Sequence, residues 1–370
     1  MKKILTVFSI IILLICLSSI NVNAEENFIY DLTDLYNSLS DGAKQSLQNI
    51  GAESADANVL SNISFNSIIN EISNIASQNI STPLKGLITI TAILLICSIL
   101  SAYKSSLSND ISTAINIVST LCIVSAIVVP AISVINNTSS VIETSSNLML
   151  AYIPVVVAMM SASGHIISSV SYYATMIATS EGIAQLSSKV IIPFLNMFLG
   201  ISITSGITPD INLSGFTNII SKTVKWLLGF SMAIFTTVLS LKQIINTSLD
   251  GVSSKAVKFA LSSFIPIVGS ALSDAYKTVQ GSIGVLKSGV GVFVILSIAV
   301  IFLPVVIQSF LWIATLWIGK LTAEVLILSQ TAKLLECVIS VFSTLLGIVL
   351  CIMSIYIIST ALVLVMGGGG

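Results

Sequence analysis

Two apolar segments near the C-terminus constrain this sequence most strongly. Val292 to Trp317 and Val338 to Val365 contain no charged residue. A helix needs roughly 20 apolar residues to cross a bilayer, and both segments are longer. Only 8% of the 370 residues are charged, whereas a soluble domain has about 25%. We therefore expect an all-α, polytopic integral membrane protein with about 6–8 transmembrane helices.

Residues 1–24 have the pattern of a secretory signal peptide. Lys2 and Lys3 precede an apolar run, and the small residue Ala24 stands before two glutamates. The alternative is an uncleaved first membrane helix. Either interpretation places residue 25 onward outside the cytoplasm.

Residues 25–83 form the only extended polar region, with eight acidic residues against the single Lys44. Apolar residues recur there every three or four positions, which predicts short amphipathic helices. Ser64 or Asn66 is the expected cap of one of them, and residues 40–42 are expected to form a turn. These helices would dock on the membrane part or on a partner, or the region would be a solvated leader to the first span.

Residues 84–251 are predicted to form a first transmembrane bundle of about five spans. The expected spans are 86–103, 114–135, 148–162, 190–207 and 227–241, with an extracytoplasmic loop at 136–147. Residues 164–188 would be a helical loop or a partly buried helix. Five spans from an external start place residue 252 in the cytoplasm. Lys104 and Lys189 agree with this orientation, whereas Lys222 and Lys225 do not.

Residues 252–291 are too polar to span and too apolar for a simple loop. Their apolar run, 259–272, is about 14 residues long, which is too short for a membrane helix. We expect a re-entrant or interfacial module, used for a pore or only for packing. Its candidate pore or packing residues are Pro266, Gly269, Asp274, Gly281 and Gly284. Its candidate contacts to a cytoplasmic partner are Lys255, Lys258, Lys277 and Lys287.

Residues 292–370 hold the last transmembrane segments. Pro304 lies inside the first of them, so the sequence is compatible with one crossing or with a hairpin about that proline. The side on which the C-terminus lies depends on this choice.

The residue inventory argues against an enzyme. His165 is the only imidazole, and the five cysteines lie in apolar runs without a CxxC pair. We therefore expect no catalytic residue, no cofactor and no metal site. All fifteen basic residues are lysines, which disfavours the arginine-based recognition that nucleic acids require. Glu143 and Glu181 are expected at span boundaries, so the spans would hold no ionisable residue of a coupled transporter.

The block FIPIVGSALSDAY (264–276), followed by Gly281-Ser282 and Gly289-Val290-Gly291, resembles the stage III sporulation protein AE family of endospore-forming Firmicutes. The similarity extends over nearly the whole chain, although its lack of arginine departs from typical members. The resemblance implies a component of a channel-like, secretion-like complex in the mother-cell membrane around the forespore, needed for forespore development.

The same resemblance implies several partners. They are other proteins of the stage III sporulation A operon, including a cytosolic ATPase, and a forespore membrane partner. A homo-oligomer is a further partner that the sequence allows. Two other functions fit the sequence, namely a free-standing small-solute permease and a non-conducting membrane scaffold.

Overall fold

The computed structural model describes residues 33–55, 57–102, 109–207, 214–264 and 269–365, and all the secondary-structure elements in these ranges are helices. The signal peptide predicted for residues 1–24 lies outside them. The helices are α2 (Thr33–Asn37), α3 (Asp41–Ile50), α4 (Ala57–Ser61), α5 (Phe65–Asn79), α6 (Ser81–Ala102), α7 (Asn109–Ala162), α8 (Ile166–Leu186), the π-helix η2 (Ser187–Ile191), α9 (Ile192–Ile207), α10 (Ser214–Phe264), α11 (Gly269–Val325) and α12 (Ser329–Val365). The all-α prediction is confirmed.

Six stretches of these helices are long and apolar enough to cross a membrane. They are Ser81–Leu100, Thr120–Ala162, Ile166–Thr204, Gly215–Asn246, Ser288–Val325 and Ser329–Leu364. This number confirms a polytopic membrane protein. Several stretches exceed one bilayer crossing, since Thr120–Ala162 has 43 residues and a span needs roughly 20.

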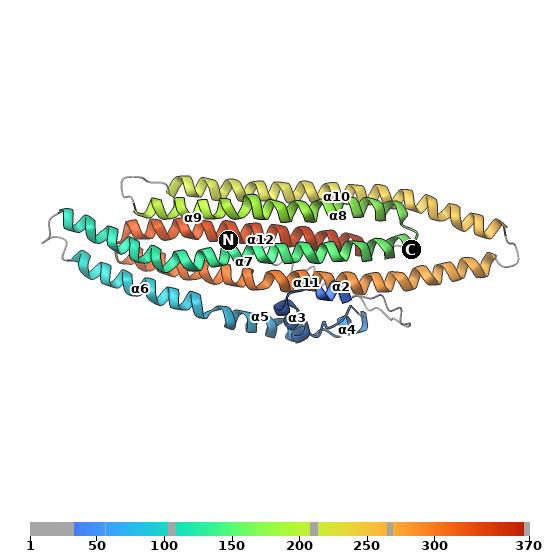
Figure 1. The fold of residues 1–370 in the computed structure, drawn as a ribbon, viewed down its shortest axis with the longest axis horizontal. Helices are drawn as coiled ribbons and strands as arrows, with labels where there is room; N and C mark the ends of the chain where they lie inside the picture. The colour runs from blue at the N-terminus through green and yellow to red at the C-terminus, as the bar shows by residue number, and fades with distance from the viewer. Residues whose placement is uncertain (1–32, 56, 103–108, 208–213, 265–268, 366–370) are drawn as a thin grey trace.

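The long helices form an elongated bundle with α12 inside it (Figure 1). An 18-residue stretch of α12 is 78% buried, against 22% for one in α6, so α12 is central and α6 peripheral. At one end of the bundle α11 turns into α12. At the other end, which we call the hairpin end, α10 ends at Phe264 and α11 begins at Gly269.

The N-terminal helices pack against the bundle rather than forming a solvated leader. Helices α3, α4 and α5 contact α11, and α2 contacts α7. Ser64 caps α5 as predicted, because its hydroxyl accepts a hydrogen bond from the Asn66 amide at 3.2 Å. The prediction of a turn at residues 40–42 is wrong. Ser40 is the N-cap of α3 and accepts from the Ala43 amide, so Asp41 begins that helix.

The extracytoplasmic loop expected at 136–147 is also wrong, because α7 is helical throughout this tract. Its polar side chains find partners without breaking the helix. The Thr138 hydroxyl donates to the Val134 carbonyl at 2.8 Å, and the Ser145 hydroxyl donates to Ile142 at 2.9 Å. Such bonds to the preceding turn satisfy a buried hydroxyl inside a continuous helix.

Four long helical paths therefore precede residue 252 where the sequence predicted about five spans. They are α6, α7, the continuous α8–η2–α9 path, and α10. An even number of crossings returns the chain to the side on which it began. With one crossing per path, the α10–α11 hairpin and residues 33–80 would share one side of the membrane; the side on which Lys255 and Lys258 lie stays a prediction.

Residues 252–291 do not form a separate element in the part of the chain that the structure describes. Helix α10 continues to Phe264, and α11 begins at Gly269 and continues through Pro304 to Val325. Of the two arrangements compatible with Pro304, one crossing or a hairpin, the structure has one continuous helix. At about 1.5 Å rise per residue, the 57 residues of α11 extend for about 85 Å, far beyond the roughly 30 Å of hydrocarbon in a bilayer.

Close helix approach depends on two glycines of the bundle. A Cβ at Gly86 of α6 would lie 2.7 Å from the buried ring of Trp312 in α11. A Cβ at Gly291 of α11 would overlap the Leu364 side chain of α12. Small residues at such crossings let membrane helices pack at short distance, which fixes α6 and α12 against α11.

Candidate functional site

The turn between α7 and α8 is built by a helix-terminating pattern of hydrogen bonds. Gly164 has φ +85°, the left-handed conformation that glycine adopts without strain. The Gly164 amide donates to the Ser161 carbonyl at 3.0 Å, and the His165 amide donates to Met160 at 2.9 Å. These two bonds form a Schellman motif, which ends α7 and directs the chain into α8.

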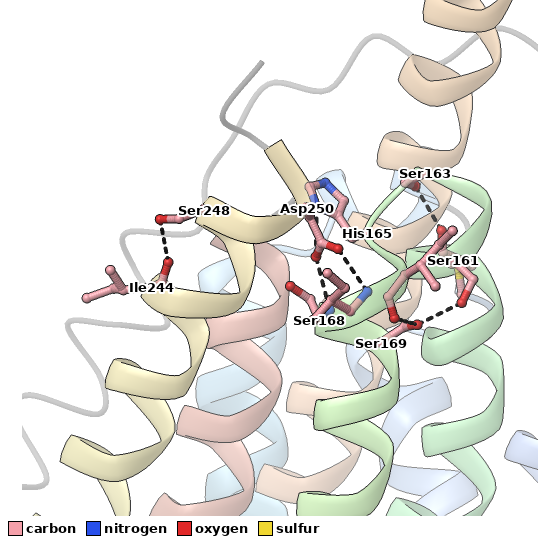
Figure 2. Close-up of polar contacts among 11 residues, drawn as sticks. Ser161, Ser163, His165, Ser168, Ser169, Ile244, Ser248 and Asp250 are labelled. Carbon is pink, nitrogen blue, oxygen red and sulfur yellow. Dashed lines mark hydrogen bonds and ion pairs between the residues drawn. The ribbon is translucent and has the colours of Figure 1, made fainter. Parts of the chain in front are cut away.

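Asp250 of α10 caps the N-terminus of α8, although it lies far away in the sequence. Its carboxylate accepts from the Ile167 amide at 2.8 Å and from the Ser168 amide at 3.0 Å (Figure 2). Those are the second and third residues of α8, whose amides have no partner inside their own helix. His165, at the N-cap position, makes no capping bond with its side chain. The carboxylate of another helix therefore replaces the usual local cap.

The Asp250 side chain is 1% exposed, and the His165 Nδ1 atom lies 3.9 Å from its Oδ2 atom. The positive end of the α8 dipole and two charge-assisted hydrogen bonds stabilise a buried carboxylate here. Beside it, the hydroxyls of Ser161 and Ser169 share a 2.8 Å hydrogen bond that links α7 to α8. The cluster therefore clamps α10 to the α7–α8 turn at the base of the hairpin.

The buried face of α8 continues this polar seam into the bundle. It carries Ser168, Ser169, Tyr172, Met176 and Ser180. The Ser168 and Tyr172 hydroxyls make no hydrogen bond within the protein, and both line a cavity of about 10 Å³ between α8 and α10. That volume holds about one water molecule, which would satisfy them.

The sequence-predicted site residues are found in both arms of the hairpin. Lys255 and Lys258 lie in α10, beyond Asp250. Gly269, Asp274, Lys277, Gly281, Gly284 and Lys287 lie in the first part of α11. Pro266 lies outside the described residues. A role of these positions in a pore or in packing stays a prediction.

Sequence reasoning missed Asp250 and misplaced Glu143. Asp250 is an acid in a polar stretch, and its partners precede it by 82 and 83 positions, so no local pattern marks it. Glu143 lies inside the apolar stretch Thr120–Ala162, not at its boundary. Across the described residues, no group of three or more His, Cys, Asp or Glu side chains is arranged to hold a metal ion.

Comparisons with known proteins agree with this architecture. The family model described as "Stage III sporulation protein AE" matches residues 55–369. "Stage III sporulation protein AE" of Bacillus subtilis (strain 168) is 24% identical over 181 residues, which are 49% of this chain and 45% of that relative. The aligned part thus spans less than half of the relative's length. No solved structure matches. Because the family model covers all six apolar stretches, the chain belongs to the stage III sporulation protein AE family.

Proposed function

We propose that this chain is an integral-membrane component of a channel-like, secretion-like sporulation complex that links mother cell and forespore. Family membership over residues 55–369 carries the proposal. The six apolar helical stretches support it, since they suit a multi-pass component. The proposed location is the mother-cell membrane around the forespore.

The α10–α11 hairpin is the surface that we assign to a partner. Its two helices extend beyond α7, α8 and α12 at the hairpin end (Figure 1). The part of α10 beyond Asp250 carries Lys255 and Lys258, and the first part of α11 carries Lys277 and Lys287. Lysine ammonium groups are strongly hydrated, so this end suits water and an acidic partner rather than lipid.

The helix count supports an extracytoplasmic partner for these lysines. With one crossing per helical path, the hairpin would share its side of the membrane with residues 33–80, and the leader pattern would export those residues. The partner would then be the forespore membrane protein or an exported part of another operon protein. A cytosolic ATPase would meet the opposite end, where α11 turns into α12.

Charge reversal tests the assignment. The variant with all four hairpin lysines changed to Glu should lose the extracytoplasmic partner on co-purification from sporulating cells and should retain the ATPase. Lys333→Glu, an exposed lysine near the other end, is the matched control and should retain the extracytoplasmic partner. Loss of the ATPase alone from the hairpin variant would refute the assignment.

Reconstitution into liposomes distinguishes the proposed component of a complex from a free-standing permease. The purified chain in liposomes should not move solutes without the other components of the complex. Partner-independent solute flux would favour a permease. A complex that assembles and supports sporulation with its conduction blocked would favour a scaffold.

A further inference from the structure

A second cavity lies between α7 and the junction of α8 with η2. Its volume is about 210 Å³, and its lining is Ser139, Glu143, Ala184, Gln185, Ser187 and Ser188. Glu143 and Gln185 are exposed, whereas Ser187 is 2% exposed. The cavity is therefore a polar recess in the side of the bundle, with Ser187 on its buried side.

The lining of the recess includes one charged residue. Glu143 is the only charged residue of Thr120–Ala162. An ionisable residue inside an apolar span is costly and commonly marks an ion pathway or an ion site. The other polar lining residues are three serines and Gln185, so the residues around the recess carry carboxylate, amide and hydroxyl oxygens.

Ser187 provides independent support for a ligand. Ser187 lines the recess, and its hydroxyl oxygen is buried and makes no hydrogen bond within the protein. Buried hydroxyls rarely remain without a partner, so something absent from the polypeptide should satisfy it. Ser187 also begins η2, where the Ile192 amide donates to the Ser187 carbonyl in the π-helical pattern. Such π-turns within α-helices often occur at functional sites.

The oxygen atoms of the lining residues determine which kind of ligand the recess can bind. Oxygen donors without sulfur or imidazole suit hard cations. One carboxylate neutralises a single positive charge. We propose that this recess binds one monovalent alkali cation, with Glu143 as its charge partner and Ser187 as its buried ligand.

Two charged neighbours modulate the site. The Lys189 Nζ atom lies 3.4 Å from the Gln185 Oε1 atom, so the protein holds its own cation beside the recess. Glu181, one turn before Gln185, is exposed and does not line the cavity. Lys189 should weaken cation binding, both by repulsion and by occupying the Gln185 oxygen, whereas Glu181 should matter little.

Binding of radioactive sodium to the purified full-length chain in nanodiscs tests the proposal. One displaceable ion should bind per chain, with non-radioactive Na⁺ or K⁺ as competitor. Glu143→Gln should weaken binding at least about tenfold, which corresponds to about 1.4 kcal/mol. Ser187→Ala should also weaken it, whereas the control Glu181→Gln should bind as the wild type does.

The Lys189→Gln variant provides a second test in case the Glu143→Gln protein does not fold. It should bind the ion more tightly than the wild type, and gel filtration should show the same monodisperse protein. Absence of saturable binding by the wild type would overturn the proposal, as would full binding by a folded Glu143→Gln protein. Displacement of sodium by equimolar Ca²⁺ would overturn the monovalent assignment.

Discussion

At the scale of single residues, Ile327 is the only non-glycine residue with a positive φ in the part of the chain that the structure describes. It has φ +59° and is 88% exposed in the turn between α11 and α12. A β-branched residue in the left-handed region costs roughly 1–2 kcal/mol, and glycine does not. Ile327→Gly should therefore raise the free energy of unfolding by about 1 kcal/mol, measured by denaturant titration in mixed micelles.

Ile327→Ala is the control for this prediction. It removes the exposed apolar side chain but keeps the Cβ atom that clashes in the left-handed conformation. It should leave the stability nearly unchanged. Equal stabilisation by both variants would mean that lost surface hydrophobicity, not backbone strain, is responsible.

Asp250 gives a second prediction at the residue scale. Asp250→Ala leaves the Ile167 and Ser168 amides without their acceptor, and the loss of a helix cap costs about 0.5–2 kcal/mol. Hydrogen exchange at residues 166–169 should accelerate in nanodiscs. Ser248→Ala is the matched control, since Ser248 donates only to its own helix at Ile244 (Figure 2). Unchanged exchange in Asp250→Ala would show that the clamp does not hold α8.

At the scale of helices, the hydrogen bond between Ser146 of α7 and Tyr356 of α12 is a test of how the bundle is joined. The two hydroxyl oxygens lie 2.8 Å apart in the buried interior. A double-mutant cycle of Ser146→Ala and Tyr356→Phe should give a coupling of about 0.6 kcal/mol, and at most about 1.7. Unfolding free energies in mixed micelles provide the four values of the cycle.

Ser145 supplies the control cycle. It is buried beside Ser146, but its hydroxyl donates to Ile142 of its own helix. Its coupling to Tyr356 should be near zero. A coupling as large as that of Ser146 would reveal a general loss of packing rather than a specific hydrogen bond.

These bonds also explain where sequence reasoning succeeded and failed. Apolar runs such as Val292 to Trp317 predicted membrane helices correctly, because the energy of burying apolar side chains depends on local composition. The polar tract 136–147 predicted a loop, yet Thr138 and Ser145 bond to their own helix and Ser146 bonds to α12. Local composition does not encode these partners. The Asp250 clamp was missed for the same reason.

At the scale of the whole molecule, the number of continuous helices determines the sidedness of every turn. The sequence predicted a boundary inside α7, and without that boundary a count of one crossing per helical path would place the α10–α11 hairpin on the opposite side. The hydropathy of each segment was interpreted correctly, but the topology depends on every boundary at once. A membrane protein with helices longer than one bilayer therefore needs its tertiary structure before loops can be assigned to sides.

Cysteine labelling tests this topology directly. In a chain whose native cysteines are replaced, Val59→Cys in α4, Ser262→Cys near the end of α10, and Ser329→Cys at the start of α12 provide three probes. A membrane-impermeant maleimide added to intact protoplasts should give residues 59 and 262 the same reactivity, and residue 329 the opposite one. The physical reason is that α6 crosses once, and an even number of long helical paths connects residue 59 to residue 262. Residue 262 reacting oppositely to residue 59, with residue 329 reacting like residue 59, would restore the five-span topology and return the hairpin lysines to the ATPase side.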